Sequence, residues 1–206
     1  MITIGITLDD VLRNKTEQFG KIFKKYVDKN INLDALDLST GNLSKIFGFK
    51  TNMEYIKFLY EDYSFEIFGE ANVPEKMLDK EFNLWHLSLN NNEHIDDELN
   101  IVLMNPREFN TSIGYTYFFL SKLATRVREI YLPEDYMSIW DKCDILITAD
   151  KKLLSKKPAN KISVKINTPY NSDDVSDFNF DSLMSLIKSK TFLVDAVEKF
   201  NENKDK

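Results

Sequence analysis

The sequence predicts an α/β protein built on a parallel sheet, with a helical insertion after the first strand. Short apolar, β-branched runs alternate with segments of helical period along most of the chain, and such alternation is typical of βαβ units. The stretch 31–98 interrupts the alternation because it contains helical patterns only. We therefore predict a core formed by residues 1–30 and 99–206, and an aromatic-rich helical cap formed by residues 31–98.

Five apolar runs are predicted to be strands. The first is Ile2–Leu8, which is too short and too β-branched for a helix. Asp9 and Asp10 follow it, and then apolar residues recur every three or four positions, as in an amphipathic helix. The other four strands are predicted at residues 99–104, 128–132, 144–147 and 161–167, and the core helices at 111–124, 136–142 and 182–200, the last broken near 189.

Composition excludes several classes of protein. The net charge of −6 argues against a nucleic-acid groove, which needs clustered Lys and Arg. One Cys excludes a disulfide within the chain and a Cys-based zinc site. No apolar run reaches the roughly 20 residues of a membrane span, and the N-terminus lacks the basic start of a signal peptide. We expect an acidic, soluble, cytoplasmic protein without direct nucleic-acid or membrane contacts.

The cap carries a dense series of aromatic residues. A small helical insertion has few positions in which to bury them, and aromatic side chains are enriched in interface cores. Two interpretations are open: the series forms the cap's own core, or it forms a surface for a partner. The interface candidates are Tyr55, Phe58, Tyr63, Phe65 and Phe68.

Three segments carry a resemblance to a known family. Ile4–Leu12 resembles the first motif of the haloacid dehalogenase-like (HAD) superfamily, in particular its 5′-nucleotidase branch. Asp144–Asp150 is similar to the family's later strand that ends in an Asp pair, and Asn167–Asn171 resembles the Thr-Pro-Tyr-Asn loop of nucleotidases. The resemblance implies a Rossmann-like sheet with strand order 3-2-1-4-5 and a crevice at the carboxyl ends of the strands.

The resemblance also implies a chemistry, phosphoryl transfer to an aspartate with Mg²⁺ beside it. In the family the first Asp of the first motif is the nucleophile, and the second is the acid and base. In this sequence Thr7 stands at the first of these positions and Asp9 at the second, while Asp10 replaces the glycine that follows. A Thr hydroxyl without an adjacent base is a poor nucleophile.

The later motifs depart from the family as well. The second motif, which should end in Thr or Ser, falls on Met104 and Asn105, and the final Asp pair falls on Thr148 and Ala149. Asp150 is displaced from that pair by one residue. For Asp9 and Asp10 the alternative to a remnant acid pair is a capped helix N-terminus.

These departures predict an inactive HAD-like protein without cofactor or metal, retained as a structural subunit in contact with copies of itself and neighbouring proteins. The sequence also resembles HAD-like proteins that crAss-like tailed phages carry near their virion genes, which implies a connector or tail ring and a location in the virion. The alternatives are a working Mg²⁺-dependent 5′-nucleotidase or phosphatase, and a nucleotide-binding sensor without turnover.

Overall fold

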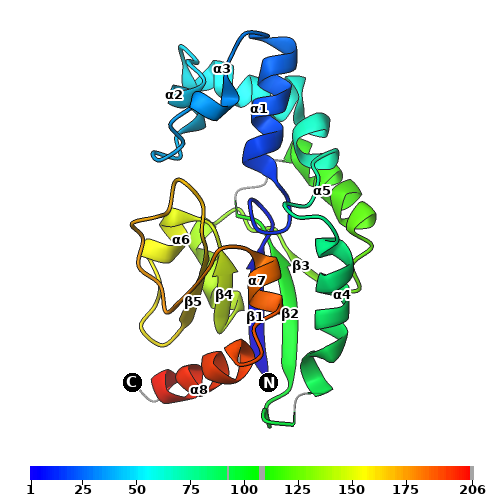
Figure 1. Ribbon diagram of the computed structural model, residues 1–206, viewed down its shortest axis with the longest axis vertical. Coiled ribbons are helices and arrows are strands. Elements are labelled where there is room, and N and C mark those ends of the chain that lie inside the picture. The colour runs from blue at the N-terminus through cyan, green and yellow to red at the C-terminus, as the bar shows by residue number, and fades with distance from the viewer. Residues whose placement is uncertain (92, 107–109, 205–206) are drawn as a thin grey trace.

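A six-stranded parallel sheet forms the centre of the molecule (Figure 1). The computed structural model describes residues 1–91, 93–106 and 110–204. The strand order is β3-β2-β1-β4-β5-β6, and each neighbouring pair is parallel. The strands are β1 (Ile2–Thr7), β2 (Leu99–Met104), β3 (Glu129–Tyr131), β4 (Ile145–Thr148), β5 (Ile162–Ile166) and β6 (Phe178–Phe180).

The five predicted strands are confirmed, and so is their order 3-2-1-4-5, but the predicted number of strands is wrong. The sixth, β6, pairs with β5 through Val164 opposite Phe178 and Ile166 opposite Phe180. It is three residues long and lies at the edge of the sheet. Three residues are too few to display an alternation, so only pairing with β5 reveals this strand.

Helices cover both faces of the sheet. One face packs against α4 (Leu78–Ser88), α5 (Asn110–Leu123), α7 (Leu183–Ile187) and α8 (Phe192–Lys204). The other packs against η5 (Tyr136–Lys142) and α6 (Lys151–Ser155). The predicted break near Ser189 is confirmed by the gap between α7 and α8. None of the described helices is both long and apolar enough to cross a membrane.

A second cluster of short helices lies beyond the carboxyl ends of the strands, around α1 (Lys15–Tyr26), at the top of Figure 1. Phe19 and Phe23 of α1 pack in one buried cluster with Phe47, Phe58 and Phe68. We call this part of the molecule the cap. Its other elements are η1 (Leu33–Ala35), α2 (Leu43–Ile46), α3 (Asn52–Lys57), η2 (Phe58–Asp62) and η3 (Phe65–Gly69).

The buried clusters divide the chain at other residues than the expected boundaries of 31 and 98. Helix α1 belongs with the cap, because its apolar face is buried there. Helix α4 and the following η4 (Leu89–Asn91) belong with the core, because Phe82, Trp85 and Leu89 pack on the sheet cluster. Sequence periodicity shows that a helix has an apolar face, but not which of two cores that face meets.

The aromatic residues proposed as an interface point into the chain instead. Phe58 and Phe68 are buried in the cap core, and Tyr55 and Tyr63 pack partly buried against it. Phe65 lies against α5, with its ring centroid 5.4 Å from that of Tyr115 and 5.3 Å from that of Phe118. The interpretation of Phe58 and Phe68 as surface residues is therefore wrong; α1 supplies the additional apolar face that buries them.

Candidate functional site

A crevice of about 370 Å³ lies between the carboxyl ends of the central strands and the cap. Parallel α/β sheets place ligand sites at this edge. The core contributes Thr7, Asp9 and Asn105 to the lining, and the cap contributes Tyr55 and Tyr60. The lining also includes Asp10, Lys15, Thr16, Phe68, Tyr136, Asp150, Lys151, Lys152 and Tyr170. The crevice thus gathers four of the predicted motif positions, Thr7, Asp9, Asn105 and Asp150, and two of the interface candidates, Tyr55 and Phe68.

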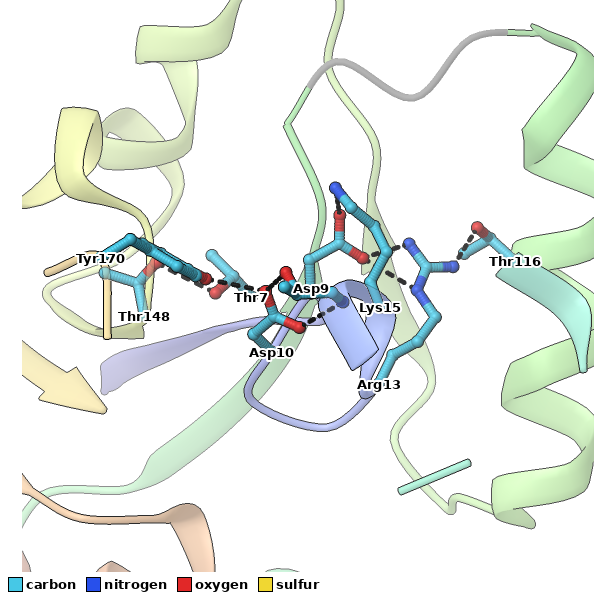
Figure 2. A network of polar contacts seen from close by, with 9 residues as sticks. Thr7, Asp9, Asp10, Arg13, Lys15, Thr116, Thr148 and Tyr170 are labelled. Atoms are coloured by element: carbon cyan, nitrogen blue, oxygen red, sulfur yellow. Dashed lines mark hydrogen bonds and ion pairs between the residues drawn. The ribbon is translucent and has the colours of Figure 1, made fainter. Parts of the chain in front are cut away.

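The carboxylate of Asp9 is held between two cationic side chains (Figure 2). Arg13 donates to Oδ1 through Nε at 2.8 Å and Nη2 at 2.6 Å. Lys15 donates to Oδ2 through Nζ at 2.7 Å. Burial alone would raise the pKa of Asp9, but the two cations outweigh it and lower that pKa to about 2. Asp9 therefore stays ionised at neutral pH.

Arg13 is fully buried and ties this motif to α5 and the cap. Its Nη1 donates to Thr116 Oγ1 on α5 at 2.7 Å. Its guanidinium lies 4.9 Å from the ring centroid of Phe68, in the cap core, and 5.7 Å from that of Phe119. A buried guanidinium is stable only when it is paired and hydrogen-bonded. Asp9 and Thr116 supply the ion pair and the hydrogen bonds that Arg13 needs.

Asp10 occupies a left-handed backbone conformation, with φ of 57°. This conformation favours glycine, which the family has at this position, and it costs energy for other residues. Three donors hold the carboxylate: the backbone N–H and the hydroxyl of Thr16, and the hydroxyl of Tyr170 at 2.8 Å. Burial and this neighbouring carboxylate raise the pKa of Tyr170 well above its usual value. Asp10 thus links the N-terminus of α1 to the loop after β5.

Two threonine hydroxyls meet at the ends of β1 and β4, at the positions that the sequence resemblance aligns with carboxylates of the HAD superfamily. Thr7 at the end of β1 donates to Thr148 at the end of β4, over 3.0 Å. Met104 and Ala149, two further positions of the compared motifs, are buried in apolar clusters. Asn105 is also buried, and it lines the crevice.

Asp150 has a local structural task. Its Oδ1 accepts hydrogen bonds from the backbone N–H groups of Lys152 at 2.8 Å and Leu153 at 3.0 Å, and so caps α6. Its own backbone N–H donates to Thr148 Oγ1.

The residues present do not fit a Mg²⁺ site of the family's kind. Such a site needs several oxygen ligands converging on one point. Asp9 is ion-paired, Asp10 is bonded to Thr16 and Tyr170, and Asp150 caps a helix. Within the described ranges, no three His, Cys, Asp or Glu side chains are grouped so that they could hold a metal ion.

Three residues that organise the crevice were missed by sequence reasoning. Arg13, Lys15 and Tyr170 all contact the aspartates of the first motif. Arg13 had a usable signal, because it stands four residues after Asp9 and is one of only four arginines. Tyr170 lies in the segment Asn167–Asn171 that carries the resemblance, but nothing local indicated its contact with Asp10, which is 160 residues away.

Comparison with known proteins bears on the fold. No family model matches the chain, and neither does any curated protein. Among the solved structures that match is a haloacid dehalogenase-like hydrolase from Burkholderia xenovorans, with a TM-score of 0.51. The fold is HAD-like. The match covers 94% of this chain and 98% of that chain, so the HAD-like likeness includes the cap, but the sequence identity is 10% and the likeness extends to the fold alone.

Proposed function

We propose that this HAD-like chain has no phosphatase activity and acts as a structural subunit, in several copies, of a larger assembly. The ion-paired state of Asp9 is the observation that carries the proposed lack of phosphatase activity. A general acid and base works best with a pKa near the operating pH, and the pKa of Asp9 is lowered to about 2. Thr7 adds support, because its hydroxyl has Thr148 as partner instead of a base.

Exposed apolar side chains on α4 and α5 support the proposed role as a subunit of a larger assembly. Leu84 is 61% and Leu87 50% exposed on α4, and Tyr117 is 51% and Phe118 44% exposed on α5. Lys122 is the only Asp, Glu, Lys or Arg residue in the sequence of α5. Interface cores are depleted of charge and enriched in aromatic residues. We propose these exposed side chains of α4 and α5, in place of the cap aromatics, as the contact with neighbouring subunits.

The identity of the assembly rests on the sequence resemblance alone. Similarity to HAD-like proteins of crAss-like phages supports a connector or tail ring of a virion as the place of the subunit. In a ring, each copy would present two different surfaces to its two neighbours. A specific contact would bury on the order of 800 Å² per partner.

The absence of catalysis is tested with purified protein, Mg²⁺, p-nitrophenyl phosphate and a panel of nucleoside monophosphates. We expect wild type and Asp9→Asn to give the same background rate. Turnover by wild type that Asp9→Asn abolishes would overturn the proposal and favour the nucleotidase alternative.

The assembly is tested by native mass spectrometry of the chain alone and co-expressed with the products of its neighbouring genes. We expect a complex with several copies, weakened by Leu84→Glu and by Phe118→Glu. Met53→Glu is the matched control, because Met53 is 75% exposed but lies on α3 in the cap. A monomer in every combination would overturn the structural role.

A second candidate function is ligand sensing, favoured by the open crevice itself. Its lining includes Lys15, Lys151 and Lys152, and its volume of about 370 Å³ suits a small molecule. Metal-free binding of nucleoside monophosphates, measured by calorimetry, would favour this candidate over the structural one if the chain also proved monomeric.

A further inference from the structure

A second cavity, of about 310 Å³, lies on the other side of Asp10 from the crevice. Asp10, Thr16 and Tyr170 line both cavities and so form a shared wall. Figure 2 shows the hydrogen bond that joins Tyr170 to Asp10. The second cavity opens between the start of α1, the cap segment 33–38 and the loop 167–170.

The walls of this cavity are mostly apolar. Leucine, phenylalanine and proline side chains supply them: Leu33, Leu36, Leu38, Phe47, Pro74 and Pro169. Leucines 33, 36 and 38 are only half-buried. A volume near 300 Å³ with apolar walls and a few polar groups is the usual form of a small-molecule site.

The charges on this cavity are of one sign. Asp10, Glu17 and Asp34 line it, and none of the described lining residues is Lys, Arg or His. Glu17 is ion-paired with Lys21 on the next turn of α1. Among the described residues, the carboxylate of Asp10 accepts hydrogen bonds from neutral groups of Thr16 and Tyr170, and Lys15, which does not line this cavity, interacts with it electrostatically. The lining therefore combines apolar walls with carboxylates, which favour a cationic ligand over an anionic one.

We propose that this cavity binds a small organic cation, an amine whose ammonium group meets the carboxylates of Asp10 and Asp34 while its apolar body lies against the leucines. A carboxylate or phosphate ligand of the same shape would lose its hydration beside like charges. An uncharged ligand of the same shape would gain the apolar contacts but not the ion pairs. The proposal does not depend on whether the crevice is catalytically active.

The test compares three six-carbon probes that differ only in the head group: n-hexylamine, hexan-1-ol and hexanoate. Binding to the full chain is followed at pH 7 by amide chemical shifts in two-dimensional NMR. We expect hexylamine to shift residues 33, 36 and 168 in a saturable way, with hexanol weaker and hexanoate without effect. Shifts confined to Lys151 and Lys152 would place the probe in the crevice and overturn the proposal.

The variant pair Asp34→Asn and Asp37→Asn separates a site from a general charge effect. Both residues are exposed and both changes remove one negative charge, but Asp37 does not line the cavity. We expect Asp34→Asn to weaken hexylamine binding about three- to fivefold and Asp37→Asn to leave it unchanged. Equal binding of hexylamine and hexanol, equal effects of the two variants, or no saturable binding would each overturn the proposal.

Discussion

The side-chain hydroxyl of Thr7 donates a hydrogen bond to the hydroxyl of Thr148, which lies 141 residues further along the chain. The two groups join the carboxyl ends of β1 and β4, and both side chains are buried. Two carboxylates at these positions would need a cation between them, because like charges repel strongly at short range. A pair of hydroxyls is uncharged and needs none.

Restoring the family's nucleophile alone should not restore chemistry. Thr7→Asp introduces a carboxylate into a buried site whose contact is the hydroxyl of Thr148. We expect a loss of about 3 kcal/mol in the free energy of unfolding, measured by urea denaturation, and no Mg²⁺-dependent hydrolysis of p-nitrophenyl phosphate. Thr7→Ser, which keeps the hydroxyl, should lose about 1 kcal/mol. Hydrolysis by Thr7→Asp would show that the final motif is misplaced.

Arg13 should be among the most sensitive single positions in the protein. Arg13→Met removes a buried guanidinium and leaves Asp9 without two of its hydrogen bonds and Thr116 without its donor. We expect a loss of about 3 kcal/mol by chemical denaturation. The double variant Arg13→Met with Asp9→Asn should recover part of that loss.

Arg126→Met is the control for this prediction, because Arg126 is exposed and its substitution should change stability by less than about 0.5 kcal/mol. If Arg13→Met lowered the free energy of unfolding as little as Arg126→Met, the hydrogen-bond network in Figure 2 would not stabilise the fold as we infer.

Asp9 should make the free energy of unfolding depend on pH in the acidic range. Its pKa in the folded chain is about 2, against 3.8 for a free Asp. A depressed folded pKa contributes stability that is present above pH 4 and is lost as pH falls towards 2. The contribution is about 2 kcal/mol. Urea denaturation between pH 6 and pH 2 should show this loss, and a flatter profile for Asp9→Asn. Identical profiles for the two proteins would contradict the ion-paired assignment.

Lys165 should hold the loop that carries Tyr170. Its buried Nζ donates to the backbone carbonyls of Asn171, Ser172 and Asp174 at 3.2, 3.3 and 2.7 Å. Lys165→Met leaves these carbonyls without that donor, and we expect a loss of about 2 kcal/mol. Amide hydrogen exchange should speed up across residues 167–177. The control Lys188→Met, at an exposed position, should change neither the free energy of unfolding nor the exchange rates in this loop. Unchanged exchange in that loop would refute the role of Lys165.

The predictable parts of the fold were those with strong local signals. The strand β1 before Asp9 and Asp10 was predicted correctly, because a short β-branched run ending in polar residues is a local pattern. The helix break near Ser189 was predicted as well. Strand β6 and the burial of Phe58 and Phe68 were not predicted, since both depend on residues distant in the sequence.

The sequence by itself determined the alternation of strands and helices, the edge of the sheet at which the crevice lies, and the residue types at Thr7, Asp9 and Thr148. Each of these depends on only a few consecutive residues. Only the tertiary structure decided what those residues do. It paired Asp9 with Arg13 and Lys15, and it packed α1 into the cap core and α4 onto the sheet. Charges and apolar faces are local properties, but their partners are set by how distant segments pack, and one sequence pattern is compatible with several such arrangements.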